Sequence, residues 1–380
     1  MFKPPIKIFN TAGPCIPADH YMVPVLSRLP IIDYFLDHGS YFTLHAPRQS
    51  GKTTLLYALT DDINARGQSY ALYCSLELLE GITDTDTALT LVVSQILKAL
   101  NDSEIEAFKK LSSNYGPGPS SRFDAKILDI LRYLSVNLDK DLVVFFDDVD
   151  SLSDKPLIPF LRQIHFGFNT RFRSRNTKFP KSMALVGMRH LVARFIQSSP
   201  DSASISASNI LSFIKESLTL PDFNQNDIKV LCSQHALASG QIFNPSAINR
   251  IWYWSEGQPW LVNALTFKVV TEFLNYDYSK SITDELVEQA AEAITQGGYP
   301  HIDYLMEQSK ELRVKRVMKT VIFDNSSFLD DVLDDDKRHV LDLGLIKKVN
   351  RTYQPANPLF VSAIFNAFPE KSQAPPTVGN

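Results

Sequence analysis

Residues 41–56 read YFTLHAPRQSGKTTLL, and the architecture expected for the chain follows largely from them. The first six residues form a short apolar run that is typical of a buried strand. Residues 46–53 then match the phosphate-binding pattern GxxxxGK[ST], except that Ala46 stands where the pattern has its first glycine. A helical pattern, TTLLYALTDDINAR, follows directly. This order predicts a phosphate-binding loop (P-loop) between a strand and the amino end of a helix.

The residues of this loop have separate expected roles. Backbone N–H groups point at phosphate oxygens, and Gly51 lets the backbone approach them. The Lys52 ammonium reaches the β- and γ-phosphates, and the Thr53 hydroxyl binds Mg²⁺. The predicted nucleotide-binding residues in this segment are Ala46, Pro47, Arg48, Gln49, Ser50, Gly51, Lys52, Thr53 and Thr54.

A second segment, FFDDVD at residues 145–150, is an apolar strand that ends in carboxylates, as in a Walker B motif. We expect Asp147 to hold Mg²⁺, usually through water, and Asp148 to orient the attacking water. That second role is more often given to Glu, whose side chain is one methylene longer, so slow hydrolysis is expected. Asp150 suits a different role, that of a cap for the following helix.

Two further features belong to the same expected site. The apolar strand MALVG (183–187) leads to Arg189, which would lie at the carboxyl edge of the sheet and sense the γ-phosphate. A surface arginine is the alternative. In EGQPW (256–260), Gly257 and Pro259 force a tight turn that could lean on an adenine ring, or could simply join two helices.

The pattern around these motifs predicts an α/β core. Strand-like runs alternate with helical patterns, which indicates a parallel sheet with helices on both faces. The expected strands are 41–46, 70–76, 142–146 and 183–187, with helices at 89–100 and 123–138. After Pro221 the strand signal gives way to helical patterns at 226–239, 246–256, 259–274 and 282–295. One or two helices from His301, followed by VLDLGLIKKV and an NRT turn, fit a winged-helix module.

The expected domains follow from these boundaries. They are a Pro-rich extended lead-in (1–25), a P-loop core (26–215), an all-α lid (216–300), a winged-helix-like domain (301–370) and a disordered tail (371–380).

Composition narrows the class of protein. The chain has 380 residues, 44% of them apolar and 21% charged, which fits a globular protein with several domains. Three scattered cysteines without a CxxC pair argue against a disulfide framework or a zinc module. No signal peptide and no long apolar run are present, so we expect a cytoplasmic protein. The histidines show no ligand spacing, which leaves Mg²⁺ carried by the nucleotide as the expected metal.

The ordered set HAPRQSGKTTLL, FFDDVD, LVGMR and SEGQPWLVNAL resembles the bacterial AAA-like ATP-binding proteins, relatives of the AAA+ and STAND ATPases. The resemblance covers nearly the whole chain. It implies a P-loop core, a helical lid, a C-terminal winged helix, and ATP with Mg²⁺ as cofactors. By the same resemblance Arg189 matches the arginine after the STAND strand, and Pro259 matches the Gly-x-Pro of the lid. Ala46 and Asp148 depart from the family pattern, which puts fast turnover in doubt.

Residues 155–200 contain nine Lys or Arg and no Asp or Glu, although the whole chain has a net charge of −4. Their centre, HFGFNTRFRSRNTKFPK (165–181), interleaves Phe with Arg, a mixture suited to phosphate contact and base stacking. Three interpretations stay open: a nucleic-acid surface, a solvated loop, or a finger in a homo-oligomer, for which Arg171, Arg173 and Arg175 are the candidates.

The expected function is an ATP-binding, slowly hydrolysing switch of AAA+/STAND type. Two alternatives remain: a nucleic-acid-associated ATPase resembling a replication initiator or loader, and a nucleotide-bound scaffold for protein interaction. Residues 310–351 carry ten basic and eight acidic side chains. A DNA-reading module is usually more basic, so the winged helix favours a protein partner.

Overall fold

The computed structural model describes residues 7–116, 126–188, 211–323, 333–350 and 352–367. The chain divides into two compact units. The sheet unit consists of Leu26–Ala46 and Leu55–Leu220. The helical unit consists of Met1–Val25, Pro47–Thr54 and Pro221–Asn380, so it includes the P-loop. The expected tail, 371–380, lies outside the described residues, and the expected domain boundaries stay predictions.

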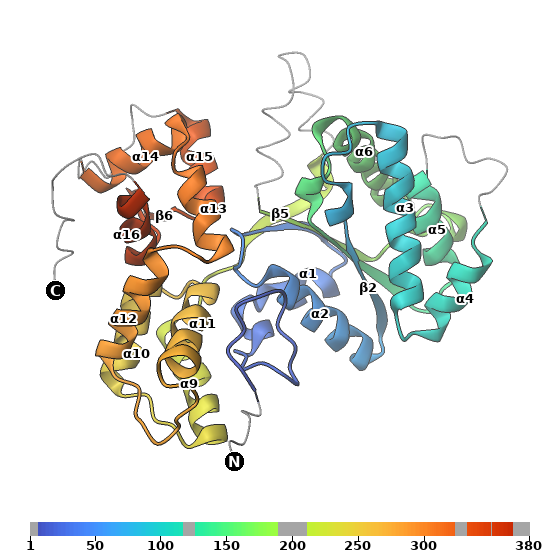
Figure 1. The fold of residues 1–380 in the computed structure, drawn as a ribbon. Coiled ribbons are helices and arrows are strands. Elements are labelled where there is room, and N and C mark those ends of the chain that lie inside the picture. The colour runs from blue at the N-terminus through green and yellow to red at the C-terminus, as the bar shows by residue number, and fades with distance from the viewer. Residues whose placement is uncertain (1–6, 117–125, 189–210, 324–332, 351, 368–380) are drawn as a thin grey trace. The chain divides into compact units, whose positions relative to one another are not determined.

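The sheet unit is built on five parallel strands in the order β2-β3-β4-β1-β5. Figure 1 shows this sheet together with its helices. The four strands expected from the apolar runs are confirmed, each within one residue at either end. The strands are β1 (Tyr41–His45), β2 (Ser69–Ser75), β3 (Asp141–Asp147), β4 (Ser182–Gly187) and β5 (Ile214–Thr219). Because the strands are parallel, the carboxyl ends of β1, β3 and β4 lie at one edge of the sheet.

Helices cover both faces of the sheet because successive strand residues point to opposite sides. Leu72, Phe146 and Leu185 are buried in the cluster formed with α3, α5 and α6. On the opposite face, the ring of Phe42 lies 5.4 Å from that of Phe35 in α1. The helices are α1 (Ile31–Asp37), α2 (Lys52–Arg66), α3 (Thr85–Asp102), α4 (Glu106–Asn114), α5 (Lys126–Asn137) and α6 (Asp154–Thr170). Short 3₁₀ turns are η1 (Val25–Arg28), η2 (Glu77–Leu79), η3 (Val149–Ser151), η4 (Arg175–Thr177) and η5 (Leu211–Phe213).

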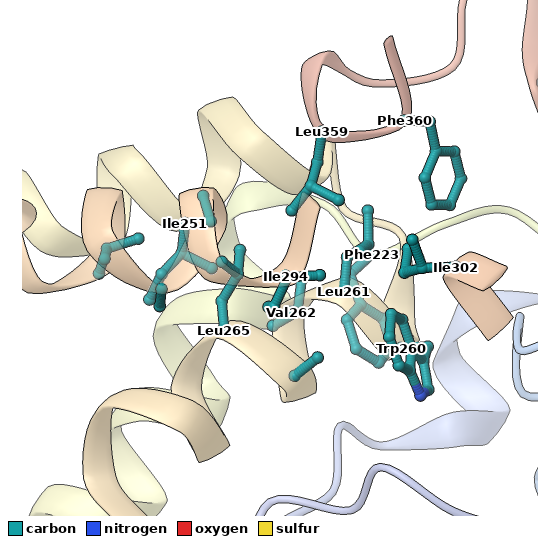
Figure 2. Close-up of a cluster of buried hydrophobic side chains, with 14 of the residues drawn as sticks. Phe223, Ile251, Trp260, Leu261, Val262, Leu265, Ile294, Ile302, Leu359 and Phe360 are labelled. Atoms are coloured by element: carbon teal, nitrogen blue, oxygen red, sulfur yellow. The ribbon is translucent and has the colours of Figure 1, made fainter. Parts of the chain in front are cut away.

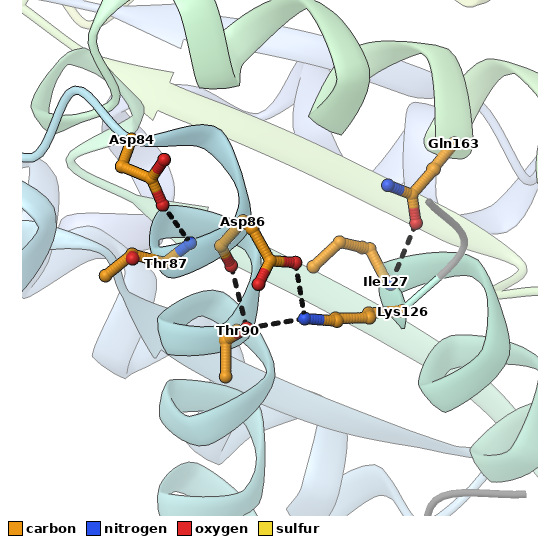
Figure 3. A network of polar contacts seen from close by, with 7 residues as sticks. All are labelled: Asp84, Asp86, Thr87, Thr90, Lys126, Ile127 and Gln163. Atoms are coloured by element: carbon orange, nitrogen blue, oxygen red, sulfur yellow. Dashed lines mark hydrogen bonds and ion pairs between the residues drawn. The ribbon is translucent and has the colours of Figure 1, made fainter. Parts of the chain in front are cut away.

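Polar contacts tie together the helices on one face (Figure 3). The Gln163 side chain of α6 accepts hydrogen bonds from the backbone N–H groups of Ile127 and Leu128, at 2.8 and 3.1 Å. It thereby satisfies two amides in the first turn of α5 that have no partner within that helix. The Lys126 ammonium binds Asp86 in α3 at 2.7 Å. These contacts fix α5 against both α3 and α6.

The helical unit has its own core, which gathers Trp260, Leu261, Ile294, Ile302 and Leu359 (Figure 2). The helices expected after Pro221 are confirmed, with the third one ending early and continuing as a π-helix turn. The elements are α9 (Gln225–Ser239), α10 (Pro245–Ser255), α11 (Pro259–Phe267), η6 (Lys268–Phe273), α12 (Asp284–Thr295), α13 (Pro300–Gln308), α14 (Leu312–Phe323), α15 (Asp334–Leu343), β6 (Ile346–Val349), β7 (Thr352–Pro355) and α16 (Pro358–Ala367).

Two features were not predicted: the burial of residues in the amino-terminal segment, and a helix near the carboxyl end. Phe9 and Tyr21 of the Pro-rich lead-in are 2% exposed and belong to the core of the helical unit. The expected hairpin is present as the antiparallel pair β6 and β7, and it is followed by α16, which was not expected. No helix among the described residues is long and apolar enough to cross a membrane.

Candidate functional site

The backbone at Ala46, where the phosphate-binding pattern has its first glycine, does not require a glycine. Ala46 is buried, and its N–H donates to the Gly187 carbonyl at 3.3 Å, which continues the β1–β4 ladder by one residue. Positive φ values in this segment fall only at Gln49 (62°) and Gly51 (90°). Glycine is therefore needed at position 51, whereas an alanine fits position 46.

The side chains of the loop fold back on its own backbone. The Lys52 ammonium is buried and donates to the Pro47 carbonyl at 2.9 Å, and the Ser50 hydroxyl donates to the same oxygen at 2.8 Å. Lys52 is also the first residue of α2. The loop thus presents a buried cation at the amino end of a helix, where the helix dipole favours an anion.

The remainder of the helical unit holds the loop from several elements. The Gln258 amide donates to the Gln49 carbonyl at 3.4 Å. The Arg48 guanidinium lies 5.1 Å from the ring centre of Tyr304 in α13. The backbone of Gly344, at the end of α15, packs against Pro47 so closely that a Cβ at position 344 would lie 2.7 Å from the Pro47 Cβ.

The residues at 256–260 suit a tight turn that contacts the P-loop. Gly257 has φ +86°, and its backbone packs against the Phe223 carbonyl, so no larger residue fits there. The Gln258 side chain caps α11 by accepting from the Leu261 N–H at 2.6 Å, and Pro259 follows as the first helical residue. The predicted tight turn is confirmed, and its Gln258 contacts the P-loop backbone.

The Walker B carboxylate ends β3 in the sheet unit. Asp147 is fully buried, and both of its carboxylate oxygens accept hydrogen bonds. Oδ2 accepts from the Tyr73 hydroxyl at 3.2 Å, and Oδ1 accepts from the Asp148 N–H at 3.0 Å. Asp148 has a left-handed backbone (φ 56°), and its carboxylate accepts from the Ser75 hydroxyl at 3.4 Å. The carboxylate of Asp147 is therefore fixed by a tyrosine of the neighbouring strand β2 and by the backbone of the next residue.

The cap expected from Asp150 is wrong. Its carboxylate accepts a hydrogen bond from the Met188 N–H, just beyond β4, while the residue before α6 is Ser153. Gly187 lies against this carboxylate, because a Cβ on Gly187 would be 2.9 Å from the Asp150 Cγ. Asp150 thus joins the ends of β3 and β4.

The structure describes Arg171, one of the candidate finger residues, but not Arg189. Arg189 lies outside the described residues. Arg171 donates to the carbonyls of Lys181 and Gly39, at 3.2 and 2.9 Å, and lies over the Phe168 ring at 4.0 Å. Its guanidinium holds the fold together at the amino ends of β1 and β4.

The carboxylate of Asp147 has the chemistry of a Mg²⁺ ligand. Among the described residues no group of three His, Cys, Asp or Glu side chains could hold an ion. Mg²⁺ keeps several waters and takes one or two protein oxygens together with phosphates, and the buried carboxylate of Asp147 is an oxygen donor of this kind.

Sequence reasoning missed the tyrosines that support these groups. Tyr73 looks like any aromatic residue on a strand, and Tyr304 like any residue on an amphipathic helix. Nothing in their spacing shows that one donates to the Walker B carboxylate and the other lies under the P-loop arginine.

Comparison with known proteins shows the family of the chain and its fold. The family model described as "AAA-like domain" matches residues 30–365. A Walker-type ATPase of Pyrococcus abyssi superposes with a TM-score of 0.59 at 13% identity, over 94% of this chain and 99% of that chain. The ORC2 protein of Aeropyrum pernix, solved in ADPNP and ADP complexes, gives a TM-score of 0.47 at 14% identity, over 91% of this chain and 95% of that one. No curated protein matches the chain.

Proposed function

The chain belongs to the AAA-like domain family and has the fold of a P-loop ATPase, and from this premise we propose that it is an ATP-dependent, slowly hydrolysing switch of AAA+/STAND type. The observation that carries the proposal is the P-loop itself. Its cation Lys52 is buried at the start of α2, in a loop whose backbone has positive φ values at Gln49 and Gly51.

Nucleotide binding follows from the chemistry of the loop. Lys52 binds the β- and γ-phosphates, which replace the Pro47 carbonyl as its partner. The N–H groups of residues 48–53 surround the phosphate oxygens, and Pro259 borders the adenine. Thr53 and Asp147 supply oxygen ligands to Mg²⁺, which neutralises phosphate charge when bound.

Slow turnover follows from Asp148. In this proposal its carboxylate orients the attacking water, but the side chain is short, and Ser75 donates to one of its oxygens at 3.4 Å. The bond from Ser75 takes up one acceptor position of this carboxylate, which leaves fewer positions for the attacking water. Arg189, for its part, reads the γ-phosphate.

The switch rests on contacts within the helical unit. The P-loop contacts the Gln258 turn, Tyr304 of α13 and Gly344 before β6. A nucleotide that moves Arg48 or Pro47 therefore changes the packing of the helices and hairpin that we assign to a lid and a winged helix. The Lys347 ammonium of β6 binds Glu256 at 2.6 Å and links the hairpin to the same turn.

Nucleotide binding is the first test. Wild type should bind Mg-ATP, Lys52→Ala should lose most of that affinity, and Lys110→Ala, which removes an exposed lysine of α4, should bind like wild type. Equal binding by wild type and Lys52→Ala would refute the proposal. Steady-state hydrolysis should be slow, and Asp148→Asn should abolish it.

The switch has a separate test. Hydrogen exchange of residues 344–356 should differ between the ATP-bound and ADP-bound protein, and Tyr304→Leu should reduce that difference. Tyr253→Leu, which changes another partly exposed tyrosine of the helical unit, is the control. Identical hydrogen exchange in both nucleotide states would be compatible with an ATPase but would refute the proposed switch.

A further inference from the structure

A rigid loop lies at the edge of the sheet that the P-loop and Walker B motifs do not use. Residues 171–181 join α6 to the amino end of β4. The Lys181 N–H donates to the Leu142 carbonyl at the start of β3, and Arg171 donates to Gly39, just before β1. The loop therefore lies at the amino ends of these strands, whereas the Walker B carboxylate lies at the carboxyl end of β3.

This loop is held in one shape. The Arg171 guanidinium lies over the rings of Phe168 and Phe172, at 4.0 and 4.7 Å, besides its two hydrogen bonds to backbone carbonyls. A capping box between Ser174 and Thr177 closes the short helix η4, with the Ser174 N–H donating to the Thr177 hydroxyl at 2.9 Å. Because the loop is already ordered, a ligand that binds the side chains between these anchors loses little affinity to the conformational entropy of the loop.

The presented side chains are cations and aromatic rings. Phe172 is 87% exposed, and Phe166, in the last turns of α6, is 53% exposed. Phe166 follows Arg162 by four residues, so both lie on one face of α6. The solvent-exposed cations of α6 and the loop are Arg162, Arg173, Arg175 and Lys178.

Nothing in the segment neutralises this charge. Residues 155–200 contain no carboxylate, and among the described residues these four cations make no ion pair. Arg132 of α5 also lies over the Phe166 ring, at 5.4 Å, but it is only partly exposed and its guanidinium donates to the Thr170 hydroxyl at 2.8 Å. The surface thus joins unpaired positive charge to exposed aromatic faces.

We propose that this surface, formed by Arg162, Phe166, Phe172, Arg173, Arg175 and Lys178, binds single-stranded nucleic acid. The cations contact phosphates, and Phe172 stacks on an unpaired base. A duplex hides its base faces and would leave Phe172 unused. The carboxylates of an acidic protein segment would satisfy the cations but would not stack on the phenylalanines.

The affinity for labelled single-stranded DNA and RNA of equal length, measured by fluorescence anisotropy over a salt series, tests the proposal. Phe172→Ala should weaken binding about tenfold, and Phe172→Trp should restore it. The double variant Arg173→Gln/Arg175→Gln should reduce the slope of log K against log salt by about 1.4, as expected for two phosphate contacts on a single strand.

Matched controls lie in the same unit. Leu78→Ala removes another exposed apolar side chain, 69% exposed, and Lys109→Gln/Lys110→Gln removes two exposed cations from α4. Both should bind like wild type. The DNA and RNA arms show which nucleic acid is preferred, and a preference for either supports the proposal.

Three results would overturn it. One is duplex binding as tight as single-strand binding, with Phe172→Ala unchanged. Another is displacement of the oligonucleotide by polyglutamate at the same charge concentration, which would assign the surface to acidic protein. The last is an equal loss in the α4 control. Because binding is measured without ATP and also in Lys52→Ala, failure of the ATP site does not affect this test.

Discussion

The hydroxyl of Tyr73 lies 3.2 Å from Oδ2 of Asp147 and donates a hydrogen bond to it from the neighbouring strand. Burial, and then the negative charge of Asp147, raise the pKa of Tyr73 far above its ordinary value, so the phenol stays protonated at physiological pH. The ring of Tyr57 in α2 lies 4.6 Å from the ring of Tyr73 and limits its rotation. Tyr73 thus helps to fix the orientation of the Asp147 carboxylate.

Tyr73→Phe removes this donor and keeps the ring. If Asp147 supports Mg²⁺ as proposed, the Mg²⁺ concentration for half-maximal hydrolysis should rise about tenfold, as is typical when a group that orients a metal ligand is lost. Binding of Mn²⁺ to the complex with a non-hydrolysable ATP analogue, followed by electron paramagnetic resonance, should weaken in parallel.

Tyr70→Phe is the matched control. Tyr70 lies on the same strand and donates to Asp139 at 3.1 Å, near the opposite end of β3. Its loss should leave the Mg²⁺ dependence unchanged. If both variants raised the Mg²⁺ requirement equally, a general effect on β2 rather than the contact with Asp147 would be responsible.

Gly187→Ala should disturb the link between the ends of β3 and β4. The added Cβ would lie 2.9 Å from the Asp150 Cγ, so the carboxylate must move away from the Met188 N–H. We expect a loss of about 1–3 kcal/mol in the free energy of unfolding, as for other overpacked sites. Gly116→Ala, where a Cβ meets nothing within 4 Å, should have little effect in the same denaturant titration.

Stability should depend on pH through His301. Burial, and to a lesser extent the Arg48 cation, lower the pKa of His301 to about 4, while its Trp260 and Phe360 neighbours are apolar. The unfolded chain takes up the proton first as pH falls through about 6.5, so stability decreases from there to about pH 4. The loss from this group is about 3 kcal/mol.

His301→Phe should therefore flatten the fall in stability between these pH values, measured by unfolding at a series of pH. The slope should not vanish, because burial also lowers the pKa of His235 in the same unit. His38→Phe, at an exposed histidine, should leave the wild-type curve unchanged. An unaltered curve for His301→Phe would contradict the prediction.

Most strands of the sheet could be predicted from the local sequence. β1, β3 and β4 are central strands buried on both faces, so their residues are mostly apolar. β2 lies at an edge, but its run YALYC is still apolar enough to predict a strand. β5 pairs only with β1 at the edge, and its IKESLT sequence buries little, so the pattern that identifies a central strand is missing. The roles of P-loop and Walker B residues stay predictions from the motifs.

Contacts between distant segments could not be predicted in this way. Arg171 is one arginine among several in a basic block, and only the fold shows that it binds the Gly39 carbonyl while Arg173 stays exposed. Likewise, Asp150 looks like a helix cap because it precedes α6, but its actual donor lies 38 residues further along the chain, at Met188. Tertiary proximity decides both cases.

Gln258 offers a test of how the P-loop is held, because its two side-chain atoms have separate partners. Oε1 accepts from the Leu261 N–H and caps α11, while Nε2 donates to the Gln49 carbonyl. Gln258→Ala loses both contacts, and we expect a loss of about 1 kcal/mol in the free energy of unfolding. Gln258→Glu keeps an acceptor for the cap and should stay within about 0.5 kcal/mol of wild type.

Both variants lose the donor to the P-loop, so both should bind nucleotide more weakly than wild type, although only one is destabilised. The measurements are thermal unfolding and equilibrium binding of a fluorescent ATP analogue. Equal destabilisation by both variants would show that the cap is not the stabilising contact. Wild-type nucleotide affinity in Gln258→Glu would show that the bond to Gln49 does not shape the loop for phosphate, and the proposed coupling between the P-loop and the 256–260 turn would then fail.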